Sequence, residues 1–228
     1  MGRGVLITGT DTDVGKTYVA CLLGRRLAGS DLTVSPMKPV ESGCSLGPDG
    51  LPFPADAAAL RDAFAPHLPL SAVCLYALPA PLSPHLAARR EGAAIDPARI
   101  RKAVRRAEKA SRIVLIEGAG GIAVEMCEGY SFADLARDLS LPVLIVAENR
   151  LGVLNHLRLS IAYLRTERLA LFGVILNDRE PDVSPARETN ESEVRRIAAD
   201  RYLGRVPFGA AVLPEDLFSR FRGVAFPQ

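Results

Sequence analysis

Residues 9–17 (GTDTDVGKT) combine glycines with a lysine and a threonine at a spacing that suits phosphate chemistry. The segment follows a short apolar run and precedes a helical pattern, which is the strand, loop and helix setting of a phosphate-binding loop. In such a loop the backbone N–H groups face a β-phosphate, Lys16 would bridge β- and γ-phosphate oxygens, and the Thr17 hydroxyl would ligate Mg²⁺. The segment therefore predicts binding of a nucleoside triphosphate with Mg²⁺.

Two acids, Asp11 and Asp13, lie inside this loop, where five residues rather than the usual four separate the glycines. Carboxylates beside a polyanionic phosphate are unfavourable unless cations compensate them. Either a substrate amine faces one of these acids, or both project into solvent. The sequence leaves both interpretations open.

Two further acids are candidate Mg²⁺ ligands, because Mg²⁺ usually takes one or two carboxylates besides phosphate oxygens and water. Glu117 follows the apolar residues 113–116 and precedes small residues at 118–121, so we expect it at the carboxyl end of a buried strand, where α/β proteins bind ligands. Asp56 opens a helical pattern, so it is either a ligand or an acid at the N-cap or in the first turn of the helix. With Thr17 these acids form a candidate metal site.

The elements that must position these residues alternate between apolar runs and helical patterns, which is typical of parallel strands covered by helices on both faces. We expect a long loop at 41–54, which is rich in Gly and Pro and has no periodicity. The pattern predicts an α/β fold of the P-loop type, with a doubly wound, mostly parallel sheet in one domain over residues 1–228. Strands are expected at 5–7, 32–34, 113–116, 143–146 and 172–176, and helices at 16–27, 97–109, 153–164 and 191–201.

Composition narrows the possible partners. Lys and Arg total 28 against 26 Asp and Glu, and the charges are interspersed, which favours a small-molecule partner over nucleic acid. The basic residues within 101–109 are read as a solvated helix face. No apolar run approaches the roughly 20 residues of a membrane helix, and residues 1–4 do not resemble a leader. The four scattered cysteines fit reduced thiols in a cytoplasmic protein.

Further motifs accompany the loop in a fixed order: Lys38-Pro39-Val40 with Ser42-Gly43, Ser83-Pro84-His85, Glu117-Gly118-Ala119-Gly120-Gly121, Leu151-Gly152 with Asn155-His156, and Asn177-Asp178. With the loop, this ordered set resembles the dethiobiotin synthetase family from the first strand to about residue 207. Ser83-Pro84 also reads as a helix N-cap with proline at the first helical position.

The resemblance implies a homodimeric ligase that converts 7,8-diaminopelargonate, CO₂ and ATP to dethiobiotin, ADP and phosphate. In that family one amine is carbamylated, ATP phosphorylates the carbamate, and the second amine closes the ring. The residue types suit this chemistry, because a carbamate that attacks a γ-phosphate gathers negative charge, which lysines and a divalent cation stabilise.

The resemblance also implies a role for individual residues. Lys16 and Lys38 would be catalytic, Asn177 would read adenine, and Thr17, Asp56 and Glu117 would hold Mg²⁺. The implied nucleotide and metal contacts are Asp13, Val14, Gly15, Lys16, Thr17, Tyr18, Asp56, Glu117, Gly118, Ala119, Gly120, Asn177, Asp178, Val206, Pro207 and Phe208. The implied substrate contacts are Thr12, Asp13, Lys38, Ser42, Gly152, Val153, Asn155 and Asn190.

The substrate carboxylate would be bound by the partner subunit, at the segment that matches 151–155. A helix N-terminus after Gly152 could bind a carboxylate through free N–H groups, with Arg150 adding positive charge. Alternatively, Gly152 is a strand-to-helix turn and Asn155 a surface amide.

The sequence departs from the family at Asp13, where Glu is usual, and at Val124-Glu125-Met126, where a proline is common.

Two other classes fit less well. A partitioning or cell-division ATPase would carry a signature lysine near the start of the loop, where Thr10, Asp11 and Thr12 stand. An amide-forming ligase of cobalamin synthesis would need a glutaminase domain, for which 228 residues leave no room.

Overall fold

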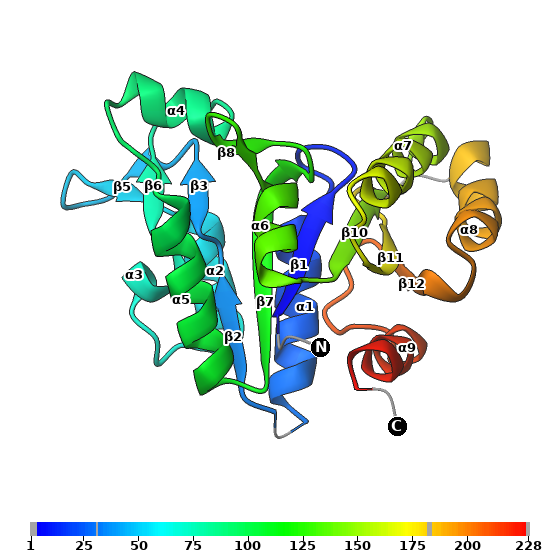
Figure 1. Cartoon of the computed structure of the whole chain (residues 1–228). Helices are drawn as coiled ribbons and strands as arrows, with labels where there is room; N and C mark the ends of the chain where they lie inside the picture. The colour runs from blue at the N-terminus through cyan, green and yellow to red at the C-terminus, as the bar shows by residue number, and fades with distance from the viewer. Residues whose placement is uncertain (1–3, 31, 182–183, 227–228) are drawn as a thin grey trace.

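The computed structural model of the chain describes residues 4–30, 32–181 and 184–226. Six parallel strands form a central sheet in the order β12-β11-β10-β1-β7-β2 (Figure 1). Because β1 lies inside the sheet with later strands on either side, the chain winds in both directions from it. The predicted α/β fold with a doubly wound parallel sheet is confirmed. The strands are β1 (Gly4–Gly9), β2 (Val34–Met37), β7 (Ile113–Gly121), β10 (Val143–Glu148), β11 (Leu171–Asn177) and β12 (Tyr202–Val206).

Helices cover both faces of this sheet, and each face has its own apolar core. On β1, Val5 and Ile7 pack with one helix layer, whereas Leu6 packs with the other. This alternation follows from the two-residue period of a strand, so a strand buried on both faces is apolar throughout. The first layer contains α1 (Lys16–Ala28), α2 (Ala55–Phe64) and α9 (Glu215–Ala225); the second contains α5 (Pro97–Ala110), α6 (Phe132–Leu139), α7 (Val153–Thr166) and α8 (Pro185–Ala198).

Short elements lie outside these layers. The predicted loop at 41–54 is only partly irregular, because it holds the end of one strand and a small hairpin. Ladders this short show no hydrophobic periodicity, which explains why the sequence did not reveal them. The additional elements are the parallel pair β3 (Val40–Ser42) and β6 (Tyr76–Leu78), the hairpins β4 (Ser45–Leu46) with β5 (Pro52–Phe53) and β8 (Glu125–Cys127) with β9 (Tyr130–Ser131), and the helices α3 (Leu70–Val73), α4 (Pro84–Arg90) and η1 (Ala199–Arg201).

Two predicted boundaries were wrong. The second strand was expected at 32–34 but spans Val34–Met37; it contains Pro36, which is tolerated because β2 is an edge strand. The helix expected at 191–201 begins at Pro185 after the N-cap residue Ser184, and ends at Ala198. Proline at the first helical position fits this earlier start.

No helix among residues 4–30, 32–181 and 184–226 is long and apolar enough to cross a membrane. In that same part of the chain, Cys21, Cys44, Cys74 and Cys127 are free thiols. Residues 1–3, on which the expectation of no leader partly depends, lie outside the described residues.

Candidate active site

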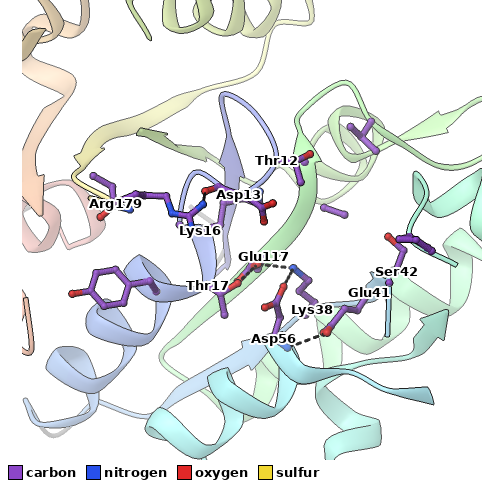
Figure 2. Close-up of a pocket in the computed structure, with 18 of the residues that line it drawn as sticks. Thr12, Asp13, Lys16, Thr17, Lys38, Glu41, Ser42, Asp56, Glu117 and Arg179 are labelled. Carbon is purple, nitrogen blue, oxygen red and sulfur yellow. Dashed lines mark hydrogen bonds and ion pairs between the residues drawn. The ribbon is translucent and has the colours of Figure 1, made fainter. Parts of the chain in front are cut away.

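A cavity of about 830 Å³ opens at the carboxyl end of the central sheet (Figure 2). Its size suits a small-molecule site, and its position is where α/β sheets bind ligands. Most of the predicted nucleotide, metal and substrate residues line it: Thr12, Asp13, Gly15, Lys16, Thr17, Tyr18, Lys38, Ser42, Asp56, Glu117, Ala119, Gly120, Asn177, Asp178 and Phe208.

The phosphate-binding loop joins β1 to α1, which begins at Lys16. Its N-cap residue Gly15 has φ 87°, a left-handed conformation that glycine adopts readily. A Cβ at this position would lie 2.2 Å from Asn177 Nδ2, so the close approach also requires glycine. Because Gly15 has no side chain to cap the helix and the helix start lines the cavity, the N–H groups of the first turn can serve as an anion-binding site.

Lys38 links two of the carboxylates in this cavity (Figure 2). Its Nζ donates to Glu117 Oε1 at 2.6 Å and to Asp56 Oδ2 at 2.8 Å. Thr17 Oγ1 donates to the same Glu117 oxygen at 2.8 Å. The structure thus brings together the three proposed metal ligands and one of the two proposed catalytic lysines, although they come from α1, α2, β7 and the turn after β2.

The two lysines experience opposite electrostatic effects. Burial lowers the pKa of Lys16, and Glu117 only partly counteracts this. Burial also opposes the charge on Lys38, but Glu117 and Asp56 outweigh it and raise the pKa of Lys38 above its usual range. Lys38 is therefore a fixed ammonium at neutral pH.

The residues present fit a bound Mg²⁺. Thr17, Asp56 and Glu117 offer oxygen donors only, as this hard cation prefers. Glu117 Oε2 is buried and has no hydrogen-bond partner among the residues that the structure describes. Within the same residues no group of three or more His, Cys, Asp or Glu could hold a metal. A site of two carboxylates and a hydroxyl matches Mg²⁺, which takes its remaining ligands from phosphates and water.

The two acids of the loop have different surroundings. Asp11 Oδ2 accepts from Arg150 at 3.1 Å, so a protein cation compensates it. Asp13 lines the cavity, and its backbone carbonyl accepts from Arg179. Both acids are exposed, and of the two it is Asp13 that lines the cavity.

Glu117 was expected just after the end of a strand, but β7 continues through it to Gly121. The ladder with β1 includes Ile7 opposite Glu117 and Gly9 opposite Gly121. The small residues that follow Glu117 permit this extension next to the phosphate-binding loop. The carboxylate is consequently held within β7, at the point beyond which the pairing with β1 becomes irregular, and 1% of its side chain is exposed.

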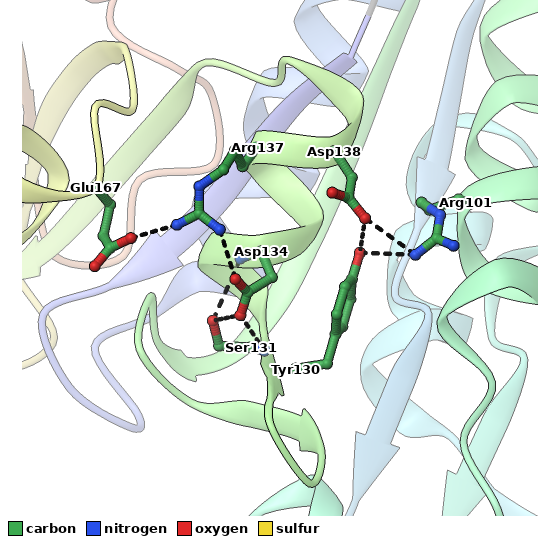
Figure 3. A network of polar contacts seen from close by, with 7 residues as sticks. All are labelled: Arg101, Tyr130, Ser131, Asp134, Arg137, Asp138 and Glu167. Atoms are coloured by element: carbon green, nitrogen blue, oxygen red, sulfur yellow. Dashed lines mark hydrogen bonds and ion pairs between the residues drawn. The ribbon is translucent and has the colours of Figure 1, made fainter.

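The segment after Gly121, whose course the departure at 124–126 left open, forms the β8–β9 hairpin, and Val124 lines the cavity. A polar network holds its base (Figure 3). Tyr130 Oη donates to Asp138 at 2.8 Å, and Arg101 donates to both. Ser131 and Asp134 form a capping box at the start of α6. The network joins the hairpin to α5 and α6.

Glu41 also lines the cavity, and the sequence did not single it out. Its Oε1 and Oε2 accept the N–H groups of Asp56 and Ala57, at 3.0 and 2.9 Å. Burial raises the pKa of Glu41, although these two bonds act in the opposite direction. Of the non-catalytic roles considered for Asp56, the N-cap is wrong, since the N-cap residue is Pro54, but Asp56 is an acid of the first turn of α2.

Asn177 is the last residue of β11, Asp178 follows it, and both line the cavity. Asn177 Nδ2 donates to the carbonyl of Val14 at 3.0 Å, while its Oδ1 is buried without a partner among the described residues. Asp178 accepts from Asn149 at 2.8 Å and from Arg205 at 2.7 Å. Asn177 thus retains an acceptor for a ligand, whereas both oxygens of Asp178 are engaged within the protein.

Several predicted residues do not line the cavity. Asn190 is buried and donates to Asn149 Oδ1 and to the carbonyl of Arg150, both at 3.1 Å. Ser83, in contrast, does line the cavity; it is the N-cap residue of α4, but its Oγ lies 3.3 Å from His85 Nδ1 instead of accepting a helix N–H. The other residues outside the lining are Val14, Gly118, Val206, Pro207, Gly152, Val153 and Asn155.

Comparison with known proteins connects this site to a family. A family model described as an AAA domain matches residues 3–216. The ATP-dependent dethiobiotin synthetase BioD of Anaeromyxobacter dehalogenans (strain 2CP-C) is 40% identical over 206 residues, which cover 90% of each chain. The chain belongs to the dethiobiotin synthetase family. Another dethiobiotin synthetase, from Aromatoleum aromaticum, is 38% identical over 220 residues, covering 96% of this chain and 97% of that one. The predicted resemblance, and with it an enzyme of this family, is confirmed.

Solved structures share the fold at much lower identity. A ParA family ATPase from Chlorobium tepidum TLS matches with a TM-score of 0.56 and 15% identity, over 100% of this chain and 95% of that one. The MinC:MinD cell division complex of Aquifex aeolicus matches with a TM-score of 0.52 and 16% identity, over 96% and 86%. Such identities show a common fold alone, so they do not favour a partitioning ATPase over a dethiobiotin synthetase.

Proposed function

We propose that this protein closes the ureido ring of dethiobiotin from 7,8-diaminopelargonate, CO₂ and ATP, with Mg²⁺, releasing ADP and phosphate. The main support is that Lys16, Lys38 and Glu117 line one cavity in a chain 40% identical to an ATP-dependent dethiobiotin synthetase. We further propose that residues 1–228 act as one domain of a cytoplasmic homodimer.

The reaction would proceed in three steps. One substrate amine adds to CO₂ and loses a proton, which gives a carbamate. A carbamate oxygen then attacks the γ-phosphorus, and the bond to the β,γ-bridging oxygen breaks as ADP leaves. Finally the second amine attacks the carbonyl carbon of this carbamic-phosphoric anhydride, phosphate departs with the C–O bond electrons, and the attacking nitrogen loses one proton to water.

The protein's part in these steps is mainly electrostatic. Lys16 would contact the β- and γ-phosphate oxygens, and Lys38 would stabilise the carbamate and the transferred phosphoryl group. Because its raised pKa keeps Lys38 protonated, it would stabilise charge and not accept a proton. Thr17, Asp56 and Glu117 would hold Mg²⁺, which when bound supplies further neutralisation of the phosphate charge.

The diamine would lie between the phosphate-binding loop and β3, where Thr12, Asp13 and Ser42 line the cavity. Its carboxylate would reach the N-terminus of α7 in the partner subunit. Gly152 at that N-cap has no side chain to block the first-turn N–H groups, and Leu151 beside it is 82% exposed. An exposed leucine next to an anion-binding helix end suits a surface that a second subunit covers.

The decisive experiment follows labelled carbon. The protein is incubated with labelled bicarbonate, diaminopelargonate, Mg²⁺ and ATP, and acid-stable label is measured. We expect label to be fixed in proportion to the ADP formed. ATP hydrolysis without fixed label would overturn the proposed function.

A further inference from the structure

Glu41 is a buried acid whose carboxylate is used neither by the phosphate-binding loop nor by Lys38. It lies on β3, which pairs with β6 through Val40 opposite Tyr76 and Ser42 opposite Leu78. Only 6% of the residue is exposed. A buried carboxylate is retained only where hydrogen bonds or cations compensate its desolvation. The bonds that do so identify its role.

Those bonds come from another element. Glu41 accepts the backbone N–H groups of Asp56 at 3.0 Å and of Ala57 at 2.9 Å, one on each oxygen. These are donors of the first turn of α2, whose own N-cap residue Pro54 cannot supply a side-chain acceptor. Glu41 therefore replaces the missing cap from a distant strand. The negative carboxylate also suits the positive end of the helix dipole.

The consequence for the site lies in Asp56. Its backbone N–H is held by Glu41, while its side chain, 46% exposed, accepts from Lys38 at 2.8 Å. An exposed carboxylate on an uncapped helix end would sample several directions. With the first turn clamped, Asp56 is kept beside Glu117 and Lys38.

We infer that Glu41 is a positioning residue that clamps the first turn of α2 and so orients Asp56 for Mg²⁺. This inference rests on the proposed function, since it uses Asp56 as a metal ligand. Both Glu41 oxygens face backbone N–H groups, so Glu41 holds the helix and not the ion. Removal of such an outer partner of a ligand typically weakens metal binding roughly 10–100-fold.

The test measures metal binding without turnover. Mn²⁺ is titrated into the full-length protein in the presence of a non-hydrolysable ATP analogue, and the concentration of free Mn²⁺ is measured by electron paramagnetic resonance. We expect Glu41→Ala to weaken Mn²⁺ binding by roughly 10–100-fold. Glu41→Gln keeps one acceptor but turns an NH₂ towards the other N–H group. Its Mn²⁺ affinity should therefore lie between those of the unsubstituted protein and Glu41→Ala. Amide exchange at Asp56 and Ala57 should quicken in the same order.

Asp96→Ala is the matched control. Asp96 Oδ1 accepts the N–H of Ala98 at 2.7 Å and caps α5, whose residues do not line the cavity. Both alanine variants should melt at a lower temperature than the unsubstituted protein. Only Glu41→Ala should need a higher metal concentration to reach half-saturation. At saturating Mg²⁺ its kcat should recover.

Unchanged Mn²⁺ affinity in Glu41→Ala, or equal weakening in Asp96→Ala, would overturn the inference. If Glu41→Ala does not fold, Glu41→Gln carries the same comparison. Failure of the proposed function is distinct, because it would show in the unsubstituted protein as absence of fixed label.

Discussion

Replacement of Lys38 by methionine should destabilise the fold far more than replacement of Asp56 by asparagine. The Lys38 and Glu117 side chains are 5% and 1% exposed, with Nζ and Oε1 2.6 Å apart. Removal of one partner of a buried ion pair costs about 3–5 kcal/mol, because the other charge stays buried and unpaired. The Asp56 side chain is 46% exposed, so solvent screens its contact with Lys38 and its loss should cost only about 0–1 kcal/mol.

The assay is reversible unfolding in urea, supported by thermal melts. For a chain of this size each kcal/mol shifts the melting temperature by about 2–4 °C, so Lys38→Met should lower it by roughly 6–20 °C. The control is the double variant Lys38→Met with Glu117→Gln, which removes the orphaned charge and should recover much of the loss. Equal losses in Lys38→Met and Asp56→Asn, or no recovery in the double variant, would refute the buried-pair reasoning.

Three further predictions concern the same cavity. The stabilisation that accompanies the raised pKa of Lys38 is complete below pH 10.5, the ordinary lysine value, and is lost as the pH rises through the pKa of the folded state. The difference in unfolding free energy between the unsubstituted protein and Lys38→Met should therefore shrink above pH 10.5, which urea unfolding at alkaline pH would measure. Lys16→Ala should lower kcat by about 10²–10³ while circular dichroism stays unchanged, and near-normal turnover would contradict its phosphate role. If the substrate site is shared between subunits, inactive Lys16→Ala and inactive Asn155→Ala chains should regain activity when co-refolded, because one site per mixed dimer is intact; mixed dimers without activity would place both residues in one subunit's site.

The parts of the fold visible in the sequence are those with strong, regular hydrophobic patterns. Five of the six central strands appear as apolar runs, although the second was misplaced. The sequence did not reveal β12 (Tyr202–Val206) as an apolar run, because Gly204 and Arg205 interrupt it and an edge strand has a neighbour on one side only. The phosphate-binding loop was recognisable because its chemistry needs residues adjacent in sequence.

Contacts between segments that are distant in the chain could not be predicted from the sequence. Glu41 binds amides 15 and 16 positions away through a β-strand and a helix start, and no spacing rule connects such positions. The pairing of Asp11 with Arg150 spans 139 positions, so the sequence could not decide which acid of the loop was compensated. Pattern reasoning identifies elements, whereas these contacts depend on how the elements pack.

The interior position of β1 has a consequence for synthesis of the chain. Its neighbours β7 and β10 begin only at Ile113 and Val143, so both edges of β1 lack partners while the ribosome makes the intervening residues. At about 5–20 residues per second, that interval lasts roughly 5–20 s for β7 alone. An apolar strand with open edges is prone to pair with other chains. Both edges of β1 are therefore open to such pairing until β7 and β10 have been made, and an N-terminal fragment that ends before β7 lacks Glu117 and cannot form the site.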